Sequence, residues 1–449
     1  MKSADVEDTF SYQYILKVSY PLIIGGVAQT IINVSDTIFL GRLSELALGA
    51  SAIAGLYYVT FFMLGVGFSI GTQILIARFD GEQKYAQIGK VFSHSAVFMG
   101  LLAILLFLIM YLGSPYILFK LIKSTEVLNA SLAFIRYRSF SIFFGFFVLL
   151  SRSFFAGISI TRMIGFTTFI SATFNIIFNY LLVFGNFGFP KMGITGSGLA
   201  STLAEACAAI YCIFYIYKFG NIKKYELLHK FTYTHSLFMQ LLKTAAPLML
   251  QVFIALWSWF VFFLIVEKMG EHELAISNLT RNVYMILMLC LMGFSNATNT
   301  LVSNLLGQKR NHELFIVLKK IVLLSLGSTL IVVLINLIFA QQSLGIFTNS
   351  ATLINDSMGC IYVISGSCLM FSVAYILLSA VSGTGNTLAT LLIETVTLVF
   401  YLFSTYLFAV KYKTSIEIVW CTEFVYFICM GFLSYWYLRR FRVERVKIR

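Results

Sequence analysis

The sequence predicts an all-α, polytopic membrane protein with twelve transmembrane helices in two pseudo-symmetric lobes of six helices each. Composition, the length of the apolar runs and an internal repeat predict this fold class. Of the 449 residues, 59% are hydrophobic and 11% are charged, whereas about a quarter of a soluble chain is charged. The chain has too few polar side chains to cover its own surface, so we expect lipid to cover it.

The apolar runs are long enough to cross a bilayer as helices. Residues 15–40, 91–112 and 321–339 are examples, and about 20 residues cross a hydrocarbon core of about 30 Å. The runs are continuous rather than alternating, which favours helices over barrel strands. With boundaries accurate to about three residues, the expected spans are 14–40, 47–77, 91–113, 132–156, 163–185, 194–217, 241–266, 274–303, 319–340, 357–381, 387–410 and 416–438.

Basic residues are distributed unevenly between the two ends of these spans. If both termini are cytoplasmic, 21 Lys and Arg residues lie on the cytoplasmic side and seven on the opposite side. This is the bias of the positive-inside rule, and it explains the net charge of +13 without a nucleic-acid partner. We therefore expect a multi-pass protein of the cell membrane, in contact with the lipid bilayer, with both termini in the cytoplasm.

The two halves of the chain match each other without a gap at an offset of 226 residues. Apolar bias alone would align Leu with Leu, but it would not keep Lys, Pro, Gly and Thr in one register. Each copy holds six spans, so the two halves enter the membrane from the same side. Matched pairs include Lys17 with Lys243, Pro21 with Pro247, Gly67 with Gly293 and Thr72 with Thr298.

The repeat predicts two parallel lobes with a cleft between them, an arrangement that suits alternating access. Pro21 and Pro247 stand at equivalent positions near the start of each lobe, and proline permits a helix to bend. We interpret them as hinges; a first-turn proline in each helix is the alternative. The expected divisions are an N-terminal lobe at 1–217, a cytoplasmic interlobe linker at 218–240, a C-terminal lobe at 241–438 and a basic cytoplasmic tail at 439–449.

Asp36 is an acidic residue inside the first span, where a charge near the bilayer centre costs at least about 2.5–3.5 kcal/mol. Asn175 and Asn179 lie four residues apart on one helix face, and Asn179 reaches a depth similar to that of Asp36. The sixth span brings hydroxyls to that depth at Thr195, Ser197, Ser201 and Thr202, of which Ser197 and Thr202 are the chosen cation-site candidates. Hard oxygen ligands suit Na⁺, and a lone carboxylate suits H⁺. Alternatively, the asparagines only join helices by hydrogen bonds.

Other charged residues lie inside predicted spans of both lobes. Arg281, Glu394 and Glu423 form a candidate polar site in the second lobe, with Arg281 as counter-charge. A buried ion pair that fixes helix packing is the alternative. Glu205, near the middle of the sixth span, is a candidate for the substrate cavity or for a structural role.

Two tryptophans and three arginines complete the set of candidates. Trp257 and Trp259 in the seventh span suit stacking on a flat or cationic substrate, and lipid-facing bulk is the alternative. Arg136, Arg138 and Arg152 lie near span ends, where we expect their side chains to extend toward the interface.

Catalytic signatures are weak. The sequence has no Walker A motif and no H-E-x-x-H, and no His pairs with a carboxylate at metal-ligand spacing. We therefore expect no enzyme, no catalytic residue and no cofactor, with Na⁺ or H⁺ as a coupling ion only.

Five segments follow one another in a distinctive order and spacing: YPLIIGGVAQTIINVSDTIFLGRL, FDGEQKYAQIGK, RSFFAGISITR, FNIIFNYLLVFGNFGFPKMGITGSGLAST and GFSNATNTLVSNLLGQKRNHE. Together they resemble the multidrug and toxic compound extrusion (MATE) transporters, over about residues 13–440. The resemblance implies antiport: a small cationic or amphiphilic substrate leaves while Na⁺ or H⁺ enters.

The resemblance also implies roles for residues that match the family's cation site. Asp36 matches its Asp on the first span and Asn175 its Asn on the fifth, whereas Asn179 stands where the family often has an acid. Ser197 matches the sixth-span ligand loosely. One branch of the family uses acids on spans seven and ten, which this chain lacks; Glu394 and Glu423 are candidate substitutes.

Two rival interpretations remain beside a monomeric exporter. A lipid-linked oligosaccharide flippase of the same wider superfamily would carry several cationic residues in its cavity, for which Arg281 is the main candidate. A membrane-embedded enzyme would carry a His, Asp and Cys cluster at one interface, which the sequence does not show.

Overall fold

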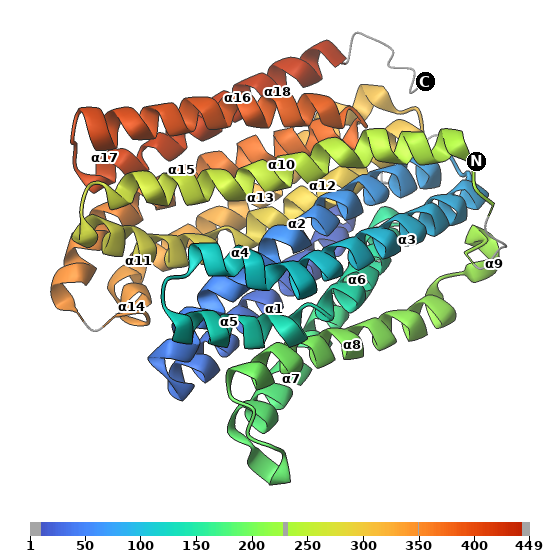
Figure 1. Ribbon diagram of the computed structural model, residues 1–449. Coiled ribbons are helices and arrows are strands. Elements are labelled where there is room, and N and C mark those ends of the chain that lie inside the picture. The colour runs from blue at the N-terminus through green and yellow to red at the C-terminus, as the bar shows by residue number, and fades with distance from the viewer. Residues whose placement is uncertain (1–9, 228–231, 349, 442–449) are drawn as a thin grey trace. The chain divides into compact units, whose positions relative to one another are not determined.

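The computed structural model describes residues 10–227, 232–348 and 350–441. Every regular element in this part of the chain is a helix (Figure 1). The first half holds α1 (Tyr12–Leu43), α2 (Glu45–Gly81), α3 (Tyr85–Leu108), α4 (Ser114–Leu121), α5 (Thr125–Arg138), α6 (Ser141–Gly157), α7 (Arg162–Phe184), α8 (Ile194–Phe219) and α9 (Ile222–Tyr225). The second half holds α10 (His235–Glu267), α11 (Glu271–Leu287), α12 (Leu289–Gly307), α13 (Leu314–Ile338), α14 (Ala340–Gly345), α15 (Ala351–Gly383), α16 (Thr387–Tyr406), α17 (Ile416–Trp420) and α18 (Thr422–Phe441).

The described residues contain ten helices that are long and apolar enough to cross a membrane. Two further spans are bent pairs, α5 with α6 and α11 with α12, each with a bend of 49° at a short break. With each pair taken as one span the count is twelve, which confirms the predicted class of polytopic α-helical membrane protein.

Several helices begin earlier than the predicted spans. α3 begins at 85 rather than 91, α10 at 235 rather than 241, and α15 at 351 rather than 357. A side chain that caps a helix end lets backbone hydrogen bonding continue beyond the apolar run. At the start of α15, the Ser350 hydroxyl accepts a hydrogen bond from the Leu353 N–H at 3.4 Å. Hydropathy marks the segment in lipid, whereas the helix itself extends into the polar region.

The helices form two compact units. One unit is Ile24–Met249, and the other combines the chain up to Ile23 with the chain from Leu250 on. The change of unit falls inside α1 and inside α10, in each case two residues after a proline. Pro21 and Pro247 both lie inside their helices, so the first-turn alternative is wrong.

Close helix packing in the unit Ile24–Met249 depends on two glycines. α8 packs against α5, α6 and α7. A Cβ on Gly198 would lie 2.6 Å from the carbonyl oxygen of Phe134 in α5, and a Cβ on Gly145 would lie 2.7 Å from Glu205 Oε2. At Gly198 the obstructing atom is backbone, so a larger residue would push α8 away from α5, whereas at Gly145 side chains of α2 and α8 would have to move.

In the other unit, α15 packs against α11, α12, α13 and α18. Trp420 is almost fully buried and packs edge-on against Phe262 and Tyr284, with ring centroids 5.1 Å and 6.1 Å away. Its indole N–H donates to the Ser277 hydroxyl at 3.1 Å. A buried aromatic cluster thus forms part of this unit's core.

Candidate functional site

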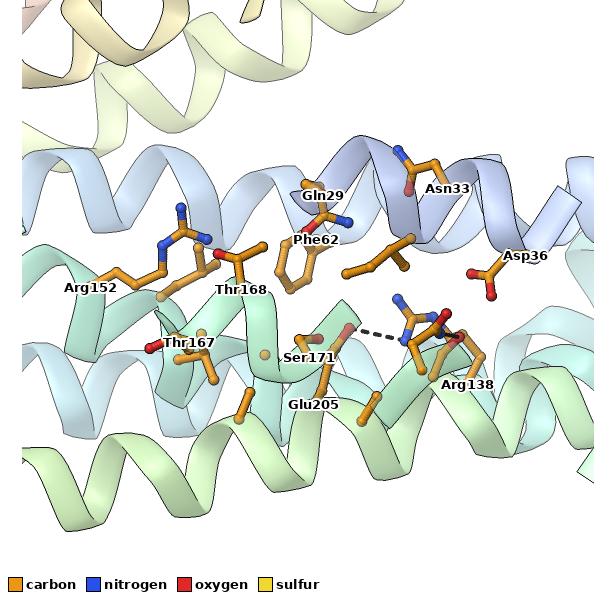
Figure 2. Close-up of a pocket in the computed structure, with 18 residues that line it drawn as sticks. Gln29, Asn33, Asp36, Phe62, Arg138, Arg152, Thr167, Thr168, Ser171 and Glu205 are labelled. Carbon is orange, nitrogen blue, oxygen red and sulfur yellow. Dashed lines mark hydrogen bonds and ion pairs between the residues drawn. The ribbon is translucent and has the colours of Figure 1, made fainter. Parts of the chain in front are cut away.

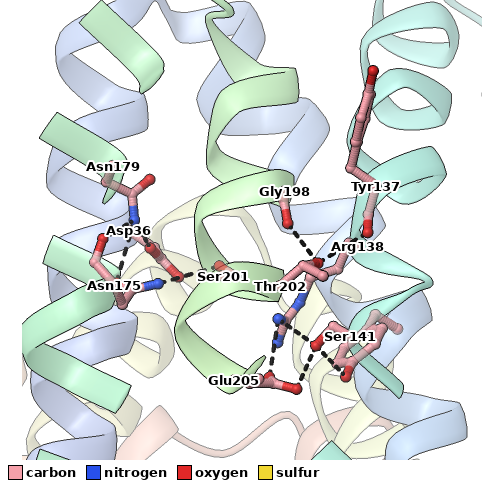
Figure 3. Close-up of polar contacts among 11 residues, drawn as sticks. Asp36, Tyr137, Arg138, Ser141, Asn175, Asn179, Gly198, Ser201, Thr202 and Glu205 are labelled. Carbon is pink, nitrogen blue, oxygen red and sulfur yellow. Dashed lines mark hydrogen bonds and ion pairs between the residues drawn. The ribbon is translucent and has the colours of Figure 1, made fainter. Parts of the chain in front are cut away.

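Three helices bring the predicted cation-site residues together. Asp36 extends from α1, and Asn179 Nδ2 on α7 donates to Asp36 Oδ1 at 2.8 Å (Figure 3). The same nitrogen lies 3.3 Å from Asn175 Oδ1, and Asn175 Nδ2 donates to Ser201 Oγ on α8 at 3.2 Å. One carboxylate, two amides and one hydroxyl therefore form a continuous polar cluster.

The cluster contains an oxygen atom without a partner. Both asparagines are almost fully buried, and Asn179 Oδ1 makes no hydrogen bond. An unpaired buried acceptor costs about 1–3 kcal/mol. Asn179 Nδ2 donates to Asp36, so this amide presents its nitrogen rather than its oxygen to the carboxylate (Figure 3). The Asp36 carboxylate, which lines a cavity, is the group that can take up a small cation.

The structure separates the sixth-span hydroxyls of Ser197, Ser201 and Thr202 from one another. Ser201 joins the Asp36 cluster, whereas the hydroxyl of Thr202 donates to the carbonyl oxygens of Tyr137 and Gly198 at 2.9 Å and 3.0 Å. Thr202 thus points toward α5, because adjacent helical residues differ by about 100° in direction. Ser197 is buried. Neither Ser197 nor Thr202 lines the polar cavity that Asp36 borders, which is described below.

Glu205 forms an ion pair inside the same unit. Its Oε1 lies 3.0 Å from Arg138 Nη1, and its Oε2 accepts a hydrogen bond from the Ser141 hydroxyl. Arg138 also donates to Ser141 at 2.8 Å and lies 4.2 Å from the centre of the Tyr58 ring. Four helices, α2, α5, α6 and α8, contribute to this network.

A polar cavity of about 120 Å³ joins these two groups (Figure 2). That volume holds several water molecules, since one needs about 10–15 Å³ of such space. Asp36, Arg138, Arg152 and Glu205 all line it. Asp36 therefore faces a polar interior rather than lipid, and Glu205 both lines this cavity and holds an ion pair, so its substrate-cavity and structural interpretations stay open.

Two arginines were misjudged from the sequence. Arg138 and Arg152 line the cavity, so the expectation that they extend toward the interface is wrong for both, while Arg136 is exposed. Gly145 allows α6 to approach α8, and the bend between α5 and α6 follows directly after Arg138. Glu205, at a similar depth in a neighbouring span, was the signal that could have assigned Arg138 a partner.

In the second unit the two glutamates bind tyrosines. Glu423 is buried and accepts from Tyr284 at 3.1 Å and Tyr401 at 2.9 Å. Glu394 is buried and accepts from Tyr426 at 2.6 Å, while its Oε2 has no partner.

Arg281 does not serve as their counter-charge. Its guanidinium lies 5.0 Å from the Phe263 ring centre and its Nε is unpaired. Among the described residues, no ion pair joins Arg281 to Glu394 or Glu423. The buried ion pair offered as the alternative is therefore absent from this part of the chain.

The two tryptophans occupy different faces of α10. Trp257 is 44% exposed, whereas Trp259 stacks on Tyr284 with ring centroids 5.9 Å apart. Neither is among the residues that line the cavity described above.

Ten single-helix spans and two bent pairs define the described part of the chain as a multi-pass membrane protein. The MatE family profile matches residues 21–181 and again residues 247–407, two stretches that differ by the same 226 residues as the internal repeat. The chain belongs to the MatE family, and it is a transporter rather than an enzyme.

The chain is similar to curated proteins that are named multidrug resistance proteins. The chain is 25% identical over 299 residues to the probable multidrug resistance protein NorM of Agrobacterium fabrum, covering 65% of this chain and 63% of that protein. It is 22% identical over 348 residues to the multidrug resistance protein NorM of Vibrio vulnificus, covering 77% and 75%.

Solved structures share the fold. An outward-facing multidrug resistance MATE family transporter of the MOP superfamily aligns with a TM-score of 0.88 at 17% identity, over 97% of each chain. A MOP superfamily transporter from Pyrococcus furiosus, described as having a binding pocket of reverse polarity, aligns with a TM-score of 0.89 at 16% identity, over 99% of each chain.

Proposed function

We propose that this protein exports small molecules by antiport against Na⁺ or H⁺, with Asp36 as the coupling carboxylate. The observation that carries the proposal is the position of Asp36: it lines a polar cavity, and among the described residues no Lys or Arg nitrogen lies within 4.0 Å of it. A carboxylate without a fixed counter-charge is available to bind and release a cation. Relatives named as multidrug resistance proteins support a multidrug substrate range.

The side chains around Asp36 admit either ion. A proton can bind directly to the Asp36 carboxylate. Na⁺ can bind oxygen atoms of Asp36, Asn175, Asn179 and Ser201, once the Asn179 amide turns its unpaired oxygen toward Asp36. In both cases the bound cation neutralises the cluster.

Coupling requires the cation to bind two conformations with different affinity. α1 carries both Asp36 and Pro21, about 22 Å apart along the helix. A proline inside a helix removes one backbone hydrogen bond and lowers the cost of a kink. Neutralisation of Asp36 would let α1 bend near Pro21, reduce the cavity and release substrate outward. The change of unit two residues after Pro21 and after Pro247 supports hinges at these positions.

The test is efflux from proteoliposomes under Na⁺ and pH gradients imposed separately. Asp36→Asn keeps the shape of the side chain and removes its charge, so we expect coupled efflux to fall to the level of empty liposomes. The exposed Asp356, paired with His272 at 3.0 Å, offers the matched control Asp356→Asn, which should transport normally. Coupled efflux by Asp36→Asn at the wild-type rate would exclude the proposed role.

Lipid-linked oligosaccharide flipping is the second candidate, because two arginines line the cavity. One of them, Arg138, is paired with Glu205, which leaves a single unpaired cation there for a pyrophosphate. We therefore favour the exporter. Deletion of the gene should lower drug tolerance without an envelope defect, and the reverse pattern would support the flippase.

A further inference from the structure

The cavity contains a guanidinium group without a protein partner. Arg152 on α6 lines it, and among the described residues no carboxylate lies within 4.0 Å of this side chain and no acceptor is hydrogen-bonded to it. Arginine carries five N–H donors and stays charged. An unpaired charge held inside a protein costs folding free energy, so its presence calls for a ligand.

Arg152 and Asp36 stand at opposite ends of the cavity (Figure 2). Arg152 Nη2 lies 3.9 Å from the point that a Cβ on Gly25 would occupy, and Gly25 precedes Asp36 by about 16 Å along α1. The pair formed by Arg138 and Glu205 is neutral as a whole. The cavity is therefore polarised, with a positive end at Arg152 and a negative end at Asp36.

Two further side chains of the cavity offer hydrogen-bond donors. Ser171 and Gln29 lie between Arg152 and Asp36 (Figure 2) and make no side-chain hydrogen bond to the described protein, so a hydroxyl and an amide N–H₂ are available. Thr167 and Thr168 donate to carbonyl oxygens of their own helix at 2.7 Å and 3.0 Å. A guanidinium together with such donors can bind an oxyanion.

We propose that Arg152 is the anchor of a carboxylate subsite, so that this one side chain sets the affinity of the transporter for substrates that carry a carboxylate. The inference rests on the proposed transport function and names part of its substrate class. An arginine fork matches a carboxylate in two parallel hydrogen bonds. A single unpaired guanidinium balances a monoanion, and the cationic group of a zwitterion would face Asp36.

The test compares two probes that differ at one group: a zwitterionic rhodamine dye with a free carboxylate and its cationic methyl ester. Binding to the purified full-length protein is measured by fluorescence polarisation without an ion gradient. Arg152→Gln should weaken binding of the acid dye by about 10- to 100-fold and change binding of the ester by less than about twofold. Arg152→Lys keeps the charge without the fork and should give an intermediate loss.

The control is Arg136→Gln, which removes an exposed arginine and should leave both dyes unaffected. Equal weakening of the two dyes by Arg152→Gln, or no weakening of either, overturns the subsite. Thermal unfolding of Arg152→Gln should occur at the same or a higher temperature than in the wild type, because the substitution removes an unpaired charge. A lower unfolding temperature would assign Arg152 a structural role and overturn the inference.

A phosphate of an anionic lipid is the other source of an oxyanion. Repeating the titration in nanodiscs of phosphatidylcholine with and without phosphatidylglycerol separates the sources. Competition by phosphatidylglycerol that is lost in Arg152→Gln would assign the site to lipid and overturn the solute subsite; no such competition supports it. Arg152-dependent binding of the acid dye without any ion-coupled efflux would refute the proposed function while supporting the subsite.

Discussion

The ion pair between Arg138 and Glu205 gives a stability prediction that can be worked from its contacts. Glu205→Gln keeps the size of the side chain and removes its charge. The variant loses the 3.0 Å contact with Arg138 as an ion pair and weakens the hydrogen bond from Ser141. Arg138 keeps its 2.8 Å bond to Ser141 and its position over the Tyr58 ring, so part of its stabilisation remains.

The expected loss follows from the exposure of the pair. Two unit charges at that separation attract by about 5–6 kcal/mol at an effective dielectric constant of about 20, and desolvation offsets much of this. The side chains are 17% and 19% exposed, facing a hydrated cavity. A hydrogen bond to a charged group contributes about 1.5–3 kcal/mol net. We therefore expect Glu205→Gln to lower the free energy of unfolding by about 2 kcal/mol.

The assay is unfolding by sodium dodecyl sulfate in mixed micelles, followed by far-ultraviolet circular dichroism. The double variant Arg138→Met with Glu205→Gln leaves no unpaired charge, so it should lose less than the sum of the two single variants, with a coupling of about 1–3 kcal/mol. Glu267→Gln, at an exposed helix end, is the control. A Glu205→Gln protein within about 0.5 kcal/mol of the wild type, or a double variant equal to the sum, would refute this account of the pair.

Two further substitutions test the packing of α8 and the hinge of α1. Gly198→Ala places a Cβ 2.6 Å from the Phe134 carbonyl oxygen and should lower the free energy of unfolding by about 1–3 kcal/mol. Gly100→Ala, whose Cβ meets nothing within 4 Å, should be neutral or stabilising. The same unfolding assay checks both variants, and equal effects would contradict the packing argument. Pro21→Ala restores a helical N–H donor and should slow efflux at unchanged dye affinity. Pro115→Ala, in the first turn of α4, is the control and should change the efflux rate little. Efflux by Pro21→Ala at the wild-type rate would exclude the hinge.

Several features of this protein could be predicted because they depend on distance along the chain and on depth in the membrane. Twelve apolar runs predict twelve spans, and the bilayer leaves the backbone no alternative to helix formation. The proximity of Asp36 and Asn179 was predictable too, since both lie at a similar depth and Asn175 shares a face with Asn179. Hydropathy gives the depth of a side chain in the membrane and helical spacing gives the face it shares, and neither requires knowing which helices pack together.

The direction in which each helix faces was decided only by the tertiary structure. Ser201 rather than Ser197 or Thr202 meets the Asp36 cluster, because the packing of α8 at Gly198 sets its rotation. Packing at Gly145 and the break after Arg138 turned two expected interface arginines into cavity residues. Side-chain partners on other helices depend on rotation about the helix axis, and that angle results from the packing of all neighbours at once rather than from the hydropathy of one segment.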